Sequence, residues 1–480
     1  MSVDGRWGMR SLGWAALVAA IAGYAYDQGP VELAGRGGDR DRVVRLWSGV
    51  FELNVVYRTM HGNDFKHLYL GAIFLGHGEN PYDEESFVTL ASRYGFRTIN
   101  PYVYPPTTGL VLRPLTYLGP SAAAWTWFWL NHAMLIGSLL LCAHLFLGFR
   151  DPWRLAIVAL LAATSFPLRR TLTAGQLNCV LLLLYGGLCW AVLRRYAWFA
   201  GLMVGFGILF KLVPGIFVVY FLWKKRWREL AWSGVWFAAI LAVSIAMAGW
   251  KVHLAYWPVM RAMGYGKSVW QARLVKDGVE PFYRDAFNQS LNSLFHHILA
   301  RDPVERQEPT EQVNPWVSLG DRGARLADGL TVLASLGLVL VALWAIGRGG
   351  GVSDVESRPP GSPPRESLEV SLMILLSLLL PSIMWDHYGV ALFLPQIVLL
   401  AHFLERREWL TWRMAVLLAA SALLARPIAF DQPDFHQGAG ILCMSAKLYG
   451  VLLVFALIVY ELVATDWTSP ADRPADAKPA

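Results

Sequence analysis

Several short polar segments interrupt long apolar runs and hold the residues most able to do chemistry. These segments are 63–67 with 78–83, 102–106, 169–178, 211, 284–292 and 385–387. Asp64 comes directly before an apolar run of helical length. Its carboxylate can therefore act as a general base, or it can cap the helix by accepting hydrogen bonds from backbone amides. Asp386 is the rival candidate for a base.

Cationic or titratable side chains in the same segments can stabilise a negatively charged leaving group. They are Arg169, Arg170, Lys211 and His387. A charge near membrane hydrocarbon costs about 2.5–3.5 kcal/mol on insertion scales, so it normally has a partner or a task. Alternatively, Lys211 snorkels from a helix break, the arginine pair binds lipid headgroups, and His387 is a hydrogen-bonded interfacial histidine. Phosphate is the ligand of the arginine pair in either case.

Composition places these segments in a membrane protein. Of 480 residues, 16% are charged and 55% are apolar, and the mean hydropathy is +0.39. These values exclude an ordinary soluble protein, a disordered chain, a collagen and a disulfide scaffold. The net charge of +7 comes from basic residues between apolar runs, which an anionic membrane face explains better than nucleic acid does. The four cysteines lie in apolar runs and are predicted to be buried: Cys142, Cys179, Cys189 and Cys443.

Apolar runs near the length that crosses a bilayer must position the polar segments. They cover about 11–26, 122–148, 152–168, 175–193, 197–223, 229–249, 326–347, 367–385, 388–404, 410–427 and 441–463. Basic residues flank the run 197–223 at both ends, and Lys211 and Pro214 interrupt it. Two shorter helices that meet near Lys211 are therefore expected. The sequence predicts an all-α integral membrane protein with about twelve transmembrane helices and both termini in the cytoplasm.

The positive-inside rule assigns sides to the loops. Most Lys and Arg residues of the short loops fall on the cytoplasmic side, and the exceptions are Arg426 and the pair Arg169 and Arg170. The polar segments then share the outer side. The predicted organisation is one membrane domain over 1–467 with extracytoplasmic loops at about 27–120 and 250–325, which carry interfacial helices, a flexible cytoplasmic linker at about 348–366, and a disordered cytoplasmic tail over 468–480.

Six motifs, in this order, resemble those of glycosyltransferase family 87, the polyprenyl-phosphate-mannose-dependent enzymes of the GT-C type. They are DFKHLYLGAIFLGHGENPYD, YVYPP, GQLN, KLVP, NQSL and PSIMWDH, within about residues 60–400. The resemblance implies a multi-pass GT-C bundle with Asp64 at the position of the family's catalytic base. It also favours retention of the first apolar segment over its cleavage as a signal peptide. Lys66 and His67 depart from the family pattern, in which aliphatic or aromatic residues are more usual.

By this resemblance we expect an enzyme that takes mannose, or a related sugar, from a polyprenyl phosphate in the outer leaflet. It transfers the sugar, with inversion, to a lipid-linked or glycolipid acceptor. Asp64 receives the proton of the acceptor hydroxyl, and a phosphate leaving group needs no carboxylic acid to protonate it. Gln176 and Asn178 bind sugar hydroxyls or only tie helices together. Further candidates for binding the acceptor or supporting the site are Lys66, His67, Tyr82, Tyr104, Asn288 and Asp386.

No metal cofactor is expected, because cationic side chains can meet the charge of a monophosphate donor. The Asp-x-Asp motif of the outer loops, at 39–41, lies in a Gly- and Arg-rich stretch and is interpreted as a solvated turn. The glycosylation sequon at 288–290 is discounted as a chance match. The leading alternative is a transporter or flippase of lipid-linked sugars, which predicts polar residues at mid-depth on both sides. A structural assembly partner is a third reading. The expected partners are the bilayer and lipid-linked substrates, not nucleic acid.

Overall fold

The computed structural model describes residues 11–22, 64–96, 99–148, 151–264, 288–300, 315–317, 319–348, 363–406, 408, 410–425, 433–465 and 467. Over these residues every element is helical, apart from one antiparallel bridge between Asn288 and Trp385. The predicted all-α class is confirmed. Several sequence-based expectations lie outside the described residues: the turn at 39–41, the polar residues Arg284 and Asp285, and the tail 468–480.

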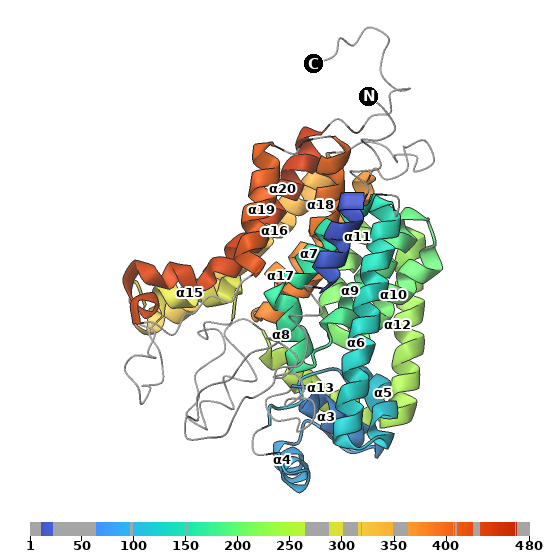
Figure 1. The fold of residues 1–480 in the computed structure, drawn as a ribbon. Coiled ribbons are helices and arrows are strands. Elements are labelled where there is room, and N and C mark those ends of the chain that lie inside the picture. Colours follow the sequence, from blue (N-terminus) through green and yellow to red (C-terminus); the bar gives the residue numbers. More distant parts are fainter. Residues whose placement is uncertain are drawn as a thin grey trace, which may run out of the picture.

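The helices follow one another in a fixed order along the chain (Figure 1). The first half holds a helix over Ser11–Ala22, then α3 (Phe65–Gly76), α4 (Glu84–Arg93), α5 (Pro106–Leu112), η1 (Arg113–Tyr117), α6 (Pro120–Cys142), η2 (Ala143–Leu147), α7 (Pro152–Ala163), α8 (Phe166–Ala174), α9 (Asn178–Leu193), α10 (Ala197–Lys211), η3 (Val213–Gly215) and α11 (Ile216–Trp223). The second half holds α12 (Trp227–Ala248), α13 (Trp250–Ala262), α15 (Leu291–Leu299), α16 (Asp321–Gly347), α17 (Arg365–Leu379), η7 (Asp386–Leu392), α18 (Phe393–Glu405), α19 (Trp412–Ala425), η8 (Pro433–His436), η9 (Gly438–Ser445) and α20 (Ala446–Ala464).

Five of the described helices are long and apolar enough to cross a membrane. They are Pro120–Leu147, Trp227–Ala248, Arg322–Gly347, Asp386–Glu405 and Gly438–Ala464. Taken together, α7 and α8 are also long and apolar enough to cross as one span bent by 55°. The described residues therefore hold up to six candidate membrane spans. The other apolar runs form shorter helices, among them α9, α10, α11 and α19. The break predicted at Lys211 is present, because α10 ends at this residue and α11 begins after the one-turn helix η3.

The most buried part of the fold is the pair α17 and α18. All 15 residues of α17 are buried, and α9, α16, α18 and α20 pack around it. The outer helices instead expose large apolar side chains, including Ile136 on α6, Val243 on α12 and Leu333 on α16. A soluble protein rarely exposes so much apolar surface, so the outside of the bundle suits contact with lipid.

Glycines allow α10 and α12 to pack closely. A Cβ atom added to Gly201 would lie 2.5 Å from the Cβ of Trp232, and one added to Gly205 would lie 2.8 Å from the backbone nitrogen of Phe237. The two glycines are four residues apart and therefore share one face of α10. Small residues at this spacing let two membrane helices approach backbone to backbone.

Segments that are far apart in the sequence meet at one end of the bundle. Figure 1 shows α3, α4, α5 and α13 together at the lower end, and the rings of Tyr82 and Tyr256 lie 5.5 Å apart there. The helix over Ser11–Ala22 and the labelled parts of α19 and α20 lie toward the other end. The predicted loop region 27–120 thus contributes α3, α4 and α5 to this end, and the region 250–325 contributes α13, whereas α15 lies to the left beside α16.

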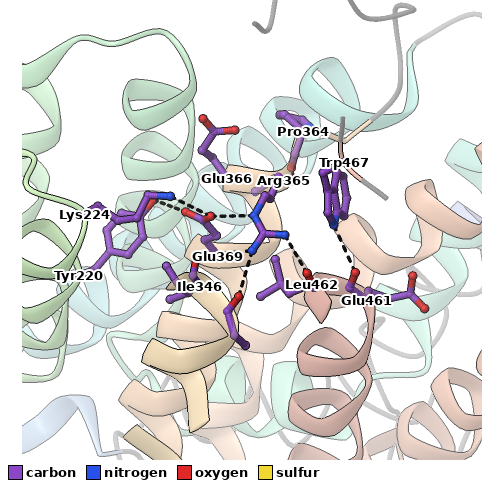
Figure 2. Close-up of polar contacts among 12 residues, drawn as sticks. Tyr220, Lys224, Ile346, Pro364, Arg365, Glu366, Glu369, Glu461, Leu462 and Trp467 are labelled. Carbon is purple, nitrogen blue, oxygen red and sulfur yellow. Dashed lines mark hydrogen bonds and ion pairs between the residues drawn. The ribbon is translucent and has the colours of Figure 1, made fainter. Parts of the chain in front are cut away.

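A buried charged cluster lies at the start of α17 (Figure 2). The Arg365 guanidinium donates to the carbonyl oxygens of Leu462 at 2.7 Å and Ala345 at 2.9 Å, near the carboxyl ends of α20 and α16. Its Nε donates to Glu369 at 3.2 Å, and Glu369 also accepts from Lys224 at 3.0 Å. The buried helix α17 begins at Arg365 and so includes the last two residues of the linker predicted at about 348–366.

The cysteine prediction is confirmed for three residues and wrong for one. Cys142, Cys179 and Cys189 are buried, whereas Cys443 is exposed. Cys443 belongs to the short helix η9, in which Ile441, Met444 and Ser445 face the interior. Apolar neighbours in sequence predicted burial, but a 3₁₀-helix turns each successive side chain to a different side.

Candidate active site

A cavity of about 560 Å³ brings together most of the predicted site residues. Its walls come from the start of α3, the segment before α5, the turn between α8 and α9, the end of α10, the helix α13 and the segment 381–388. Eight of the predicted residues line it: Asp64, His67, Tyr104, Arg170, Gln176, Lys211, Asp386 and His387. The predicted residues outside this lining are Lys66, Tyr82, Arg169, Asn178 and Asn288.

Asp64 faces the cavity with its carboxylate held by two neutral amides. Oδ2 accepts a hydrogen bond from Nε2 of Gln176 at 2.9 Å, and Oδ1 accepts one from Nδ2 of Asn100 at 3.4 Å. Asp64 occupies the N-cap position of α3, but its side chain makes no capping hydrogen bond. The capping alternative is therefore wrong for this carboxylate, which is turned toward the cavity instead of the helix.

Gln176 is fixed by the turn between α8 and α9. Gly175 ends α8 in the left-handed conformation with φ of 68°, which glycine adopts at little cost, and its carbonyl accepts from the Trp127 indole at 2.8 Å. The Tyr104 hydroxyl donates to Oε1 of Gln176 at 3.0 Å. With Oε1 engaged in this way, the amide nitrogen of Gln176 must point to Asp64.

Lys211 reaches the cavity from the end of α10. Its ammonium donates to Oδ1 of Asn178 at 3.2 Å and lies 3.8 Å from the ring centroid of Tyr388. Asn178 in turn donates to the hydroxyl of Thr171 at 3.2 Å. Asn178 therefore ties α8, α9 and α10 together without lining the cavity. The described partners of Lys211 are neutral, so an anionic ligand in the cavity would be the group that stabilises its ammonium.

The arginine pair separates at this site. Arg170 lines the cavity and Arg169 does not, because consecutive residues of a helix point in directions about 100° apart. His387 lines the cavity from η7, and its backbone carbonyl accepts from Thr171 at 3.0 Å. The helix α8 thus sends Arg170 into the cavity and anchors His387 through Thr171.

Asp386 has a cationic partner that the sequence interpretation missed. Oδ1 of Asp386 lies 3.2 Å from Nζ of Lys447, and both side chains are less than 7% exposed. The Lys447 ammonium also lies 4.0 Å from the ring centroid of Phe166. One lysine on α20 thereby joins the starts of η7 and α8. The signal was available, since Lys447 is a charge inside the apolar run 441–463.

The remaining candidates near Asp64 have separate surroundings. His67 stacks on Tyr104 with ring centroids 6.0 Å apart, and burial lowers the pKa of His67 to about 4. Burial also lowers the pKa of Lys66, although Asp64 opposes this shift. The Tyr82 hydroxyl donates to the carbonyl of Tyr104 at 2.7 Å and so supports a cavity wall. His67 is thus a neutral side chain at neutral pH.

Asn288 supports another wall from outside. Its Oδ1 accepts from the backbone nitrogen of Met384 at 3.0 Å, and Asn288 forms the bridge with Trp385. Asn288, Gln289 and Ser290 are each at most 1% exposed in this structure. Such burial agrees with the interpretation of the glycosylation sequon as a chance match. The motif instead holds the segment that carries Asp386 and His387.

The sequence interpretation also missed Asn100, Tyr256 and Tyr388, which line the cavity. Asn100 stands two residues before the motif YVYPP, and Tyr388 directly follows the motif PSIMWDH. The closeness of Asn100 and Tyr388 to these motifs was the signal that could have identified these two residues.

Among the described residues, no group of three or more His, Cys, Asp or Glu side chains could hold a metal ion. The prediction of a metal-free reaction is not tested by this arrangement and stays a prediction.

Comparison with known proteins identifies related sequences. The model of glycosyltransferase family 87 matches residues 102–356, which is more than half of the chain. The polyprenol-phosphate-mannose-dependent alpha-(1-2)-phosphatidylinositol pentamannoside mannosyltransferase of Mycolicibacterium smegmatis is 34% identical over 150 residues, which cover 31% of this chain and 36% of the relative. A protein from Corynebacterium glutamicum, an alpha-(1->3)-arabinofuranosyltransferase, is 32% identical over 141 residues, which cover 27% of this chain and 31% of the relative.

The matched regions cover only part of each chain, and their bounds matter for the site. The chain spans only about a third of the length of the curated relatives it matches. Asp64 lies before the first residue of the family match, 102, whereas Gln176 and Lys211 lie within it. No solved structure matches the chain.

Proposed function

Because the chain belongs to glycosyltransferase family 87, we propose that it is a membrane enzyme that transfers mannose, or a related sugar, from a polyprenyl phosphate to a lipid-linked or glycolipid acceptor. The names of the mycobacterial relatives support the donor, and the arabinofuranosyltransferase supports the wider choice of sugar. The observation that carries the proposal is the carboxylate of Asp64 in one cavity with the cations Arg170 and Lys211.

Asp64 serves as the general base in this proposal. The acceptor hydroxyl attacks the anomeric carbon, a new C–O bond forms, and the hydroxyl proton passes to the carboxylate. The bond from the anomeric carbon to the phosphate oxygen breaks, and its electron pair leaves with the polyprenyl phosphate. A single displacement from the opposite face inverts the anomeric centre. The amides of Gln176 and Asn100 aim the carboxylate without neutralising it.

The leaving phosphate is assigned to the cationic wall. Lys211 and Arg170 line the cavity, and His387 lies beside them. Cationic donors in a partly enclosed site stabilise charge that develops on a leaving group more strongly than they would in water. Because these side chains can meet the charge of a monophosphate, we propose that transfer proceeds without a divalent metal.

Asp64 is preferred over Asp386 as the base because of their partners. Asp386 is already paired with the ammonium of Lys447 at 3.2 Å, whereas the described partners of Asp64 are neutral amides. The Lys447 ammonium occupies Oδ1 of Asp386, so this oxygen is less accessible to an acceptor hydroxyl than the carboxylate of Asp64 is. We therefore assign Asp386 a positioning role for the segment that carries His387.

We further propose that the cavity opens on the outer face of the membrane, with about twelve membrane segments and both termini in the cytoplasm. The positive-inside pattern of the short loops supports this orientation. The paired exception, Arg169 and Arg170, supports it as well, because Arg170 lines the cavity, where this proposal gives it a phosphate to bind. Single cysteines introduced at positions 100 and 225 of a cysteine-free protein should react with an impermeant reagent from opposite sides of sealed vesicles.

A transporter or flippase of lipid-linked sugars is the alternative. It requires polar side chains along a path that reaches both sides of the membrane. The cavity residues instead gather near one end of α9 and α10, with Asn178 and Lys211 at the helix ends that meet there. This one-sided arrangement favours an enzyme.

The experiment that tests the function is a transfer assay with the purified full-length protein. Labelled polyprenyl-phosphate-mannose is supplied with a glycolipid extract, and both the labelled product and the released polyprenyl phosphate are measured. Equal amounts of the two products support sugar transfer. Movement of intact polyprenyl-phosphate-mannose across vesicles, without release of polyprenyl phosphate, would support the flippase and contradict the enzyme.

A further inference from the structure

A second hollow lies far from the cavity, where α9, α10 and α12 begin or end. Its volume is about 380 Å³, and two arginines and four aromatic residues line it: Arg195, Arg228, Tyr196, Trp198, Trp232 and Trp236. Lys211 lies at the other end of α10 from Trp198. At 1.5 Å per residue, these two positions are about 20 Å apart along the helix axis. The hollow therefore lies roughly two thirds of a hydrocarbon thickness from the cavity.

The aromatic wall is suited to the depth of lipid headgroups. Tyr196, Trp198 and Trp232 are 47%, 49% and 39% exposed. The Trp236 indole donates to the carbonyl of Trp198 at 3.1 Å, which fixes the two helices at this wall. Indole and phenol rings prefer the membrane interface, because one edge is apolar and the other is polar.

The charged wall is cationic. The guanidinium of Arg195 lies 3.0 Å from Glu366, and a guanidinium has further N–H groups with which to bind a second anion. Arg228 is exposed and makes no ion pair or side-chain hydrogen bond among the described residues. Among the residues that the structure describes, no carboxylate lines the hollow itself. The two arginines therefore give the hollow a positive charge, which suits an anionic ligand.

The backbone that presents Arg195 is also unusual. Arg195 adopts a φ of 60°, in the left-handed region, directly after the end of α9. Glycine is the common residue at this place after a helix, and another residue costs on the order of 1 kcal/mol. This arginine occupies the position despite that cost.

We propose that this hollow binds the headgroup of an anionic phospholipid from the leaflet opposite the cavity. The phosphate lies between Arg195 and Arg228, and the glycerol and upper acyl carbons lie along Trp198 and Trp232. The arginines supply bidentate phosphate contacts, and the rings supply the apolar surface that a soluble anion would not use. The proposal goes beyond sugar transfer and does not depend on it.

The test is native mass spectrometry of the full chain in detergent. Phosphatidylglycerol and phosphatidylcholine with identical acyl chains are titrated separately, and the dissociation constant of the first bound lipid is measured. We expect tighter binding of phosphatidylglycerol. Arg228→Gln should weaken it about fivefold, which is what one basic side chain contributes at an anionic surface. Trp198→Leu should weaken it as well, whereas Arg228→Lys should retain most of the preference.

Arg194→Gln is the matched control. Arg194 is an exposed arginine directly before Arg195, in the turn after α9, but it does not line the hollow. The variant removes the same charge and should leave the lipid preference unchanged. Equal binding of the two lipids by the wild-type protein would overturn the proposal. Equal losses for Arg194→Gln and Arg228→Gln would overturn it too, as would displacement of the lipid by soluble glycerol phosphate.

Discussion

Asp64→Asn removes the carboxylate while keeping the shape of the side chain. In the structure, Oδ2 accepts from Gln176 and Oδ1 accepts from Asn100. Asparagine offers one oxygen and one NH₂ group, so one of these donors loses its acceptor. Gln176 cannot invert its amide to compensate, because Tyr104 already donates to its Oε1. Asn100 can turn its own amide to accept from the new NH₂ group, so at most one net hydrogen bond is lost, at a cost of no more than about 1 kcal/mol of stability.

The expected loss of activity is much larger than the loss of stability. Removal of a general base lowers the rate about 100-fold or more, which corresponds to at least about 2.7 kcal/mol in the activation free energy. The assay compares kcat for release of polyprenyl phosphate with the melting temperature of the same preparation. We expect a folded, membrane-inserted variant with almost no transfer.

The control for this prediction is Asp386→Asn, which should reduce transfer less, because Lys447 already holds the Asp386 carboxylate. Near-normal turnover by Asp64→Asn, together with collapse of turnover in an Asp386→Asn protein whose melting temperature is preserved, would move the base to the later segment. Near-normal turnover by both variants would refute carboxylate base catalysis at these two positions.

Four further predictions concern packing, charge and conditions. Lys447→Met leaves the Asp386 carboxylate buried without its cation and should destabilise the protein by about 3–5 kcal/mol in thermal unfolding, and the double change Lys447→Met with Asp386→Asn should recover part of that loss. Gly205→Leu should separate α10 from α12 and lower the melting temperature. Gly234→Ala should not lower it, because a Cβ added to Gly234 meets nothing within 4 Å. Equal melting temperatures for the two variants would contradict the packing argument. Burial lowers the pKa of His67 to about 4, so its imidazolium forms only as the pH falls toward 4. His67→Gln should therefore leave the pH profile of transfer unchanged between pH 5.5 and 8. A shift of either side of that profile would show that His67 titrates in this range. Transfer should persist in excess chelator, and complete loss that magnesium or manganese restores would count against the metal-free proposal.

Local features of the site were predictable from the sequence, and contacts between distant residues were not. The helix break at Lys211 followed from a lysine and a proline inside an apolar run, because both disfavour a continuous span. The bond between Gln176 and Asp64 joins residues 112 positions apart, and no periodicity in one sequence encodes such a pair. Shared sidedness placed both residues near one membrane face, but only the fold brings their side chains together.

Neighbouring charges show a second limit. Arg169 and Arg170 are equivalent in composition and charge pattern, and the phase of α8 alone decides that Arg170 lines the cavity. Lys447 shows the opposite case. Its signal was present, but averaging hydropathy over a long apolar run hides a single lysine.

The short helices explain why the expected number of membrane segments and the number of long apolar helices differ. α8 ends at the turn that holds Gln176, α9 begins at Asn178 and α10 ends at Lys211, so each of them ends where the cavity lies. Ends of helices expose backbone polar groups, which hydrocarbon does not tolerate unless they line a polar cavity. The end of α10 places Lys211 in the cavity, and the start of α9 places Asn178 behind it, where Asn178 accepts from Lys211. These helices are therefore shorter than a full membrane crossing, and where they end they bring Gln176, Asn178 and Lys211 together around one site.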